Sequence, residues 1–230
     1  MSTCHTRMRV LSLLLVLLVQ LAAHPIASST EKEEDEGTCK DGVHNVVVAR
    51  SDLSNPKPAI IKHFSGTVYT TDFEPSCHQK RATVLLPGWV VLKEGELHVP
   101  KKYDLIKDGV LKLTVKGSNF DDPLCIDGIS QYIALPHSFC TVNLCKFIGY
   151  EKCELLQEPG VHTIKELEEK LGFNSTLALP EPPSLLGISL LDLFSGEFSF
   201  GFTLESEGEA ILDVKIPVND KFLQIGVTDE

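Results

Sequence analysis

The sequence lacks the short motifs by which most catalytic and nucleotide-binding sites are recognised. It has no G-x-S-x-G nucleophile turn, no H-E-x-x-H metal pair and no glycine-rich phosphate loop. Its histidines occur singly, and the adjacent acids Asp121 and Asp122 would point to opposite faces of an extended segment. A glycosidase instead needs two carboxyl groups that face one bond. We therefore predict no catalytic residues, no enzyme activity and no cofactor.

Basic residues are scarce relative to acidic ones. The chain has 21 Lys and Arg against 32 Asp and Glu, which gives a formal charge of −11. No cluster of basic residues with interleaved aromatic residues offsets this charge, which repels the phosphates of nucleic acids. We therefore expect no nucleic-acid partner.

The N-terminus has the pattern of a secretory signal peptide. Arg7 and Arg9 precede an apolar run from Val10 to Ala23. This run is shorter than the roughly 20 apolar residues of a membrane-spanning helix, and it ends at His24-Pro25 beside small residues that permit cleavage. We predict that residues 1–27 are removed, which moves the formal charge from −11 to −13 because two arginines and no acid leave. The protein is expected to be secreted, and then extracellular or lysosomal.

An acidic segment, residues 28–38, follows the predicted cleavage site. It has no apolar residues that could pack, which is typical of a solvated, disordered lead-in. The length of residues 39–230 fits a single β-rich domain. No segment in this range is long and apolar enough to span a bilayer.

Six cysteines follow the predicted signal peptide, an even number that suits disulfides in an oxidising compartment. Zinc is the competing interpretation, but the four cysteines from Cys125 to Cys153 are separated by 14, four and seven residues and include no C-x-x-C pair. We therefore predict structural disulfides and no metal site. Because six cysteines allow 15 pairings, the connectivity stays open. The cysteines are Cys39, Cys77, Cys125, Cys140, Cys145 and Cys153.

Apolar residues after Cys39 recur with the period of two that half-buried strands show. The clearest alternation runs from Phe198 to Leu204 and, after a polar turn, from Ala210 to Ile216, which predicts a β-hairpin. One helix is indicated over Thr163–Leu171, with a capping box at its start and Gly172 at its end. We predict an all-β fold, an antiparallel β-sandwich or cup-like barrel with one short helix, stapled by disulfides. Other strands are expected within 44–50, 66–71, 81–86, 89–92 and 110–115.

Two apolar segments are compatible with either a packed core or a lipid-contacting surface. Pro180 to Phe194 begins with prolines and continues with dense apolar residues, so it is either a buried segment or a loop at the mouth of a cavity. The phenylalanines of the predicted hairpin would each contribute about 1.5–3 kcal/mol as core residues, and they would equally suit the wall of a cavity for an acyl chain. Periodicity does not distinguish these alternatives.

Asn174 begins a sequon for N-glycosylation, Asn174-Ser175-Thr176. Asn55 and Asn219 lack the hydroxyl residue that a sequon requires two positions later. In a secreted chain this pattern predicts a glycoprotein whose sequon lies in an exposed segment.

Several of these features together resemble the ML lipid-recognition family, and most closely its ganglioside activator branch. Pro87-Gly88 opens a strand pair that ends at Leu124-Cys125, and further cysteines follow down to Cys153. A Leu-Pro segment at 177–183 precedes the apolar loop, and Gly196-Glu197-Phe198 begins the hairpin. The family usually ties its first strand to its last by a disulfide, whereas this sequence has no cysteine after Cys153. The resemblance therefore leaves the disulfide pairing open.

The resemblance covers residues 82–217 and implies a β-sandwich whose sheets part to hold acyl chains or a sterol. It implies a protein that lifts lipid from membranes for transfer, or for presentation to an enzyme. The expected partners are a lipid (glycolipid, phospholipid or sterol), a membrane surface in transient contact, and a lipid hydrolase. Burying an acyl chain yields about 0.8 kcal/mol per CH₂ and needs no catalytic residue. The residues predicted to contact lipid are Trp89, Leu185, Leu186, Ile188, Leu190, Leu191, Phe194, Phe198, Phe200 and Phe202.

A solid core would point to a different function. The chain would then be a secreted, disulfide-rich interaction protein, such as an inhibitor or a receptor ligand, that uses the loops between Cys125 and Cys153 for recognition. A hydrolase is a third hypothesis, and it would need a Ser or Asp beside a histidine in a cleft, an arrangement that no motif supports. A continuous apolar cavity would distinguish the lipid carrier from the interaction protein.

Overall fold

Residues from Cys39 onward form one compact unit. The predictions for residues 1–27 and for 28–37 lie outside the described part of the chain. Among the described residues, no helix is long and apolar enough to cross a membrane. The computed structural model describes residues 38–133, 135–179, 181 and 195–227, and the backbone alone of 184–185 and 188–189.

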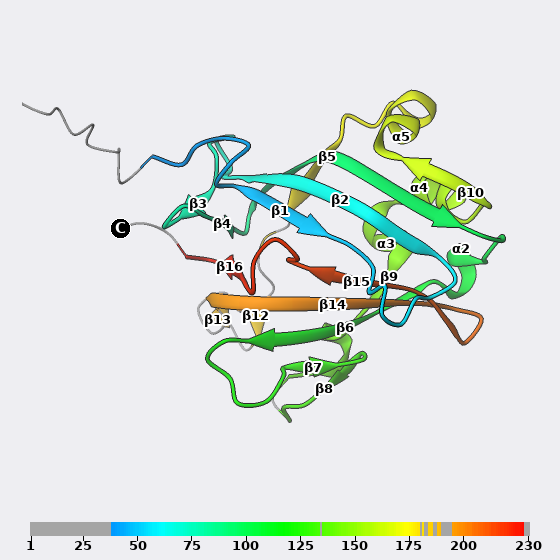
Figure 1. Ribbon diagram of the computed structural model, residues 1–230. Coiled ribbons are helices and arrows are strands. Elements are labelled where there is room, and N and C mark those ends of the chain that lie inside the picture. Colours follow the sequence, from blue (N-terminus) through cyan, green and yellow to red (C-terminus); the bar gives the residue numbers. More distant parts are fainter. Residues whose placement is uncertain are drawn as a thin grey trace, which may run out of the picture. The chain divides into compact units, whose positions relative to one another are not determined.

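The first sheet is built on two long antiparallel strands, β2 (Ile60–Tyr69) and β5 (Gly88–Val99) (Figure 1). On the free side of β2 lies β1 (Val46–Ala49), and along β5 lie β10 (Gly160–Thr163) and β11 (Thr176–Leu179), all antiparallel. Strands predicted within 44–50, 66–71 and 89–92 are confirmed. β2 and β5 extend beyond the β-branched runs that indicated them, because neighbouring strands pair along their whole length.

The second sheet is organised around β14 (Gly196–Ser206). One side of β14 pairs with β6 (Val110–Gly117), and the other pairs with β15 (Glu209–Ile216) and then with β16 (Leu223–Ile225). At one end of the sheet, β16 pairs in parallel with β4, and β4 pairs with β3. At the other end, the free side of β6 pairs with β7 and with β9, and β7 pairs in turn with β8. β12 and β13 form a separate pair. The bounds are β3 (Cys77–His78), β4 (Arg81–Val84), β7 (Cys125–Ile126), β8 (Ile129–Ser130), β9 (Thr141–Asn143), β12 (Ser184–Leu185) and β13 (Ile188–Ser189).

The hairpin predicted for the C-terminal region is confirmed as β14 and β15. Glu207 and Gly208 form its turn with φ of 53° and 78°, the left-handed conformation that a tight two-residue hairpin turn requires. In this register Phe202 lies opposite Val214 on one side and Leu113 on the other. Alternate residues of β14 therefore point into the interior together.

The helix predicted at Thr163–Leu171 is confirmed as α5 (Ile164–Leu171). The Thr163 side chain caps it by accepting a hydrogen bond from the Glu166 amide at 3.1 Å, and Gly172 ends it with φ of 62°. The described residues contain other short helices that the sequence did not indicate, because a helix of three to seven residues shows too little of a 3.6-residue period. They are α2 (Leu105–Asp108), α3 (Leu144–Ile148), α4 (Tyr150–Leu156) and the 3-10 helix η1 (His137–Phe139).

Three disulfides confirm the prediction that the cysteines are structural. Each cysteine is bonded to its neighbour in sequence: Cys39 to Cys77, Cys125 to Cys140, and Cys145 to Cys153. The third bond joins α3 to α4, and both of its cysteines are fully buried. The second bond joins β7 to the residue before β9, so the cysteines from Cys125 to Cys153 staple both an edge of the second sheet and the helical region.

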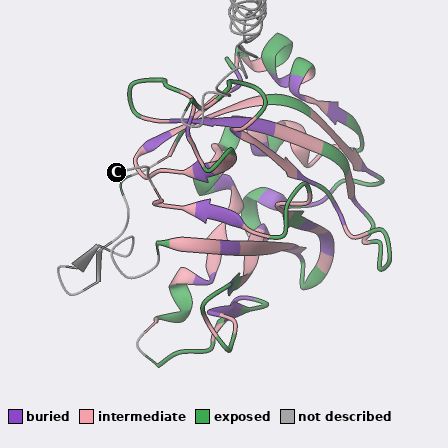
Figure 2. Ribbon diagram, turned by 60° about the vertical axis from the view of Figure 1, so that its left-hand side comes forward, coloured by how far each residue is buried: buried purple, intermediate pink, exposed green. Residues whose placement is uncertain are grey.

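The predicted all-β class and the antiparallel β-sandwich are confirmed. Buried residues gather between the two sheets, and exposed residues lie mainly on loops, hairpins and the outer faces of the helices (Figure 2). In the described part of the chain both sheets keep free edges, so the barrel alternative is not adopted. The helices α2 to α5 lie at one end of the sandwich, away from β3, β4 and β16 (Figure 1).

The capping of α5 can be tested by a substitution that leaves the core unchanged. Thr163→Ala should lower the free energy of unfolding by about 1 kcal/mol, because the Glu166 amide loses its acceptor. Lys165→Ala is the matched control on the same helix, since that side chain is 80% exposed and should change stability by less than about 0.5 kcal/mol. Urea unfolding with the disulfides intact measures both values. Equal effects would contradict the capping role.

Candidate functional site

An apolar cavity lies between the two sheets at the end covered by the helices. Its volume is about 340 Å³, which is within the roughly 300–1,000 Å³ of small-molecule sites. The β5 sheet contributes Ile61, Phe64 and Leu97 to its wall, and the β14 sheet contributes Phe202 and Val214. The wall is almost entirely carbon, so the cavity suits an apolar occupant.

A close approach across β5 shapes one wall of the cavity. The Phe64 ring lies against Gly95, its partner in the register of β2 and β5. A Cβ atom at Gly95 would stand 2.5 Å from Phe64 Cδ2 and 3.1 Å from Ile164 Cγ1, so any side chain there would displace the ring or α5. The glycine therefore allows α5 to pack close to the sheet and close the cavity on that side.

The helices supply the third wall. Leu144 and Ile148 of α3, Leu156 of α4 and Leu167 of α5 line the cavity together with the strands. The buried Cys145–Cys153 disulfide fixes α3 to α4 beneath these side chains. Because the helices are inserted at this end of the sandwich, the inner faces of the two sheets do not fill the space between them.

The cavity reaches the surface beside Phe147. This residue lines the cavity and yet is 66% exposed. Lys152 and Phe173, both half-buried, line the same region, and Lys152 Nζ lies 5.1 Å from the centre of the Phe173 ring. The mouth therefore lies between α3, α4 and the turn that follows α5.

Of the predicted lipid-contacting residues that the structure describes with side chains, Phe202 lines the cavity. Phe198 and Phe200 follow it on the same face of β14, with successive ring centres 6.2 and 6.4 Å apart, but they lie beyond the cavity wall. Phe198 is 4% exposed and packs on Phe120. The phenylalanine stripe thus forms cavity wall at one end and packed core at the other.

Trp89 lies away from the cavity. It is near the start of β5, paired with Tyr69 at the end of β2, whereas the cavity lies along the later part of β5. Its ring stacks on the half-exposed Phe73 with centres 5.1 Å apart, and its Nε1 donates to the Thr71 carbonyl at 3.2 Å. Trp89, the only tryptophan in the sequence, is predicted to contact lipid, but it does not line the cavity.

The predicted mouth segment falls largely outside the described residues. The backbone of Leu185 and Ile188 belongs to β12 and β13, and their side chains lie outside the description. The whole of Leu186, Leu190, Leu191 and Phe194 lies outside it as well. The contribution of this segment to the mouth stays a prediction.

The sequence reasoning missed the mouth residues that α3, α4 and the following turn supply. A local signal existed for α3, since Asn143 is a good helix cap and its side chain accepts from the Lys146 amide at 2.9 Å. The apolar pair Phe147 and Ile148 follows this cap. Asn174 is exposed as predicted, in the turn after α5, and its glycosylation stays a prediction.

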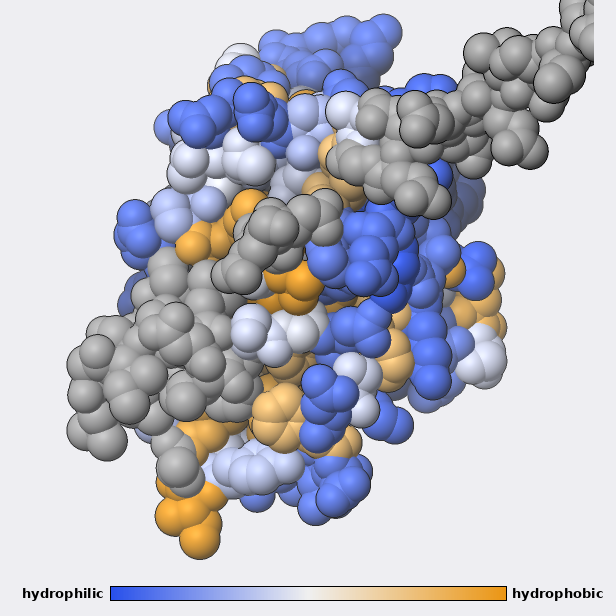
Figure 3. Space-filling model, turned by 90° about the vertical axis from the view of Figure 1, so that its left-hand side faces the viewer, coloured by the Kyte–Doolittle hydropathy of each residue, from blue (hydrophilic) through white to orange (hydrophobic). Residues whose placement is uncertain are grey.

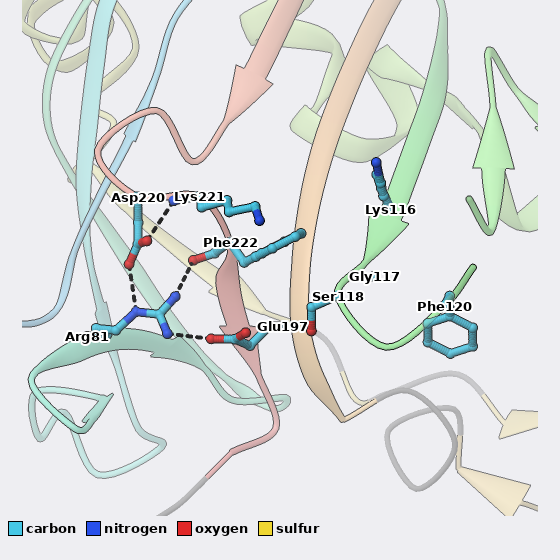
Figure 4. A pocket seen from close by; sticks show the side chains of 9 residues that line it. All are labelled: Arg81, Lys116, Gly117, Ser118, Phe120, Glu197, Asp220, Lys221 and Phe222. Atoms are coloured by element: carbon cyan, nitrogen blue, oxygen red, sulfur yellow. Dashed lines mark hydrogen bonds and ion pairs between the residues drawn. The ribbon is translucent and has the colours of Figure 1, made fainter. Parts of the chain in front are cut away.

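A polar surface depression of about 590 Å³ lies at the opposite end of the sandwich (Figure 4). At its centre Arg81 of β4 contacts Glu197 of β14, donates to Asp220 Oδ2 at 2.6 Å, and donates to the Phe222 carbonyl at 3.0 Å. Hydrogen bonds to Glu197 and Asp220 raise the pKa of Arg81. Burial acts to raise the pKa of Asp220, but the hydrogen bond and charge of Arg81, together with the backbone amides of Lys221 and Phe222, outweigh burial, and the pKa is lowered.

These contacts join β4, β14 and the segment before β16, and they occupy the guanidinium group. The depression is therefore held together by groups that are already paired, whereas the apolar cavity has an unfilled interior. Among the described residues, no three His, Cys, Asp or Glu side chains are grouped to hold a metal ion. The cavity is the candidate functional site.

Comparison with known proteins does not assign the chain to a family. No family model matches the chain, and no curated protein sequence matches it significantly. The resemblance to the ML family stays a prediction, and function has to be argued from the cavity.

The Arg81 contacts predict a pH-dependent loss of stability. Arg81→Gln should destabilise the protein at pH 7, and the difference from the unchanged protein should shrink below about pH 4. The pKa of Asp220 in the folded protein is lowered. Asp220 therefore contributes to the free energy of unfolding above the ordinary carboxyl pKa, and this contribution is lost as the pH falls through the lowered pKa. Urea unfolding at both pH values measures the difference.

Lys116→Gln provides the matched control, because Lys116 is exposed in the same depression and forms no ion pair with any described residue. This variant should keep the stability of the unchanged protein at both pH values. If Arg81→Gln were equally destabilising at pH 7 and at low pH, the ion pairs would not be the source of its effect.

Proposed function

We propose that the protein binds a lipid in the cavity between its sheets and carries it through an oxidising, secretory compartment. The observation that carries this proposal is a continuous apolar cavity of about 340 Å³ that reaches the surface beside Phe147. The three disulfides suit a protein that leaves the reducing cytosol.

The apolar wall of the cavity favours an apolar occupant. Water inside it would meet almost no hydrogen-bonding groups, because the wall is nearly all carbon. A lipid chain that fills the cavity would gain about 0.8 kcal/mol for each CH₂ removed from water.

Exposed aromatic side chains, one at the mouth and one close to it in sequence, support transient contact with a membrane. Phe147 and Tyr150, which are 66% and 52% exposed, lie at the end of α3 and the start of α4. Aromatic residues favour the interface between a membrane and water. A lipid that leaves the bilayer at this surface would reach the cavity without crossing water. A lipid hydrolase could receive it from the same mouth.

The Cys125–Cys140 loop supports a second candidate function, recognition of another protein. Ile129 is 57% exposed and Ile133 is fully exposed, and no charged residue occurs between Asp127 and Lys146. Apolar side chains project at the lower left of the molecule in Figure 3, near the level at which Figure 1 draws β7 and β8. Ile133→Ser would weaken binding of such a partner and leave lipid uptake unchanged, which separates the two functions.

Lipid binding is tested by purifying the natively secreted protein and extracting it for mass spectrometry. We expect a bound lipid, and we expect the delipidated protein to take up a fluorescent acyl probe. Leu97→Trp, which fills the cavity, should weaken probe binding about tenfold, the equivalent of about two buried CH₂ groups. Val161→Trp is the control, because Val161 is 52% exposed on the neighbouring strand β10 and lies outside the cavity wall.

Absence of both extracted lipid and probe uptake would contradict the proposed function. Equal loss of binding in Leu97→Trp and Val161→Trp would show that the probe binds outside the cavity.

A further inference from the structure

The charged side chains of the cavity wall differ in whether they already have partners. Glu96 lines the cavity, but its carboxylate is bound by His98 and by Lys62 Nζ at 2.9 Å. Hydrogen bonds from His98 and Lys62 hold the pKa of Glu96 below its ordinary value. This acid is ionised and compensated within the protein, so it does not need a cation from a ligand.

His162, the histidine in the cavity wall, is also fully engaged. It is 6% exposed, and its Nδ1 lies 2.9 Å from Glu166 Oε2 while its Nε2 lies 2.8 Å from the Glu158 carbonyl oxygen. Both ring nitrogens are thus held by α5 and by the segment before β10. The histidine offers no free polar atom to a ligand.

Lys152 differs from both of these residues. Its ammonium group lies over the Phe173 ring at 5.1 Å, and within the described ranges no carboxylate lies within ion-pair distance of it. An aromatic face does not accept the N–H donors of an ammonium group as a carboxylate does, so these donors stay available to an anion. Lys152 therefore leaves a positive charge available at the mouth of an apolar cavity, in a chain whose formal charge is −11.

The volume of the cavity limits the apolar part of the ligand. At about 30 Å³ for a group the size of a water molecule, 340 Å³ holds about eleven such groups. A methylene group is of similar size, so the space fits one chain of roughly a dozen carbons.

We infer that the ligand is a single-chain amphiphile with an anionic head group, which lies at Lys152 while the chain lies in the cavity. A carboxylate, a sulfate or a phosphate ester would satisfy the ammonium group equally. This inference rests on the proposed function and adds to it the charge of the head group and the number of chains.

The test compares two ligands that share one acyl chain, the anion dodecanoate and its neutral methyl ester, methyl dodecanoate. Each displaces the neutral probe Nile red from the delipidated full chain. The unchanged protein should bind dodecanoate about fivefold more tightly than the ester, as expected for an ion pair at a partly exposed site. Lys152→Gln should abolish this preference, so that the anion and the ester bind with similar affinity. Lys152→Arg should retain the preference because it keeps the charge.

Lys146→Gln is the matched control, since Lys146 is exposed on the adjacent helix α3 and lies outside the cavity wall. It should retain the preference of the unchanged protein. Equal affinity of the unchanged protein for the two ligands, or an unaltered preference in Lys152→Gln, would overturn the inference while lipid binding stands. Failure of both ligands and Nile red to bind would instead overturn the proposed function. If Lys152→Gln folds poorly, the unchanged protein is tested by adding salt. Its preference for dodecanoate over the ester should weaken as the salt concentration rises, and a preference that salt does not change would contradict the inference.

Discussion

The pairing register of β14 is the constraint on which the interior of this protein depends. Phe202 is paired with Leu113 of β6 and with Val214 of β15, and the Glu207–Gly208 turn sets the register on the β15 side. Because successive strand residues point to opposite faces, a shift of one residue would turn Phe202 to solvent and bring its polar neighbour Thr203 inward. The cavity wall exists only in the observed register.

A sandwich with this register would ordinarily pack its two inner faces together. Here α3, α4 and α5 occupy one end, and the buried Cys145–Cys153 disulfide ties the first two of these helices to each other. Their apolar side chains meet both sheets, so the sheets are spaced by the helices and leave a cavity instead of interdigitating. Toward the other end the stripe continues as packed core around Phe198, and the polar contacts of Arg81 join the strands there. One stripe therefore serves both as core and as cavity wall.

The parts that sequence reasoning predicted correctly are those with local signals. The β14–β15 hairpin has a period of two around a polar turn, and α5 has both of its caps in the sequence. The pairing of the cysteines and the position of Trp89 depend instead on which strands and helices become neighbours, and a local sequence pattern does not indicate this. Phe147 and Lys152 belong to helices too short to show a period, so the mouth of the cavity became visible only in three dimensions.

The central claim is that the space between the sheets is not filled by the protein's own side chains. Diffraction from crystals of the delipidated protein under xenon tests this directly, because xenon binds in apolar cavities of proteins. We expect xenon peaks between Phe202 of one sheet and Leu97 of the other, and we expect these peaks to disappear when dodecanoate is bound. An interior in which the side chains of the two sheets and the helices meet, with no xenon between them, would contradict it.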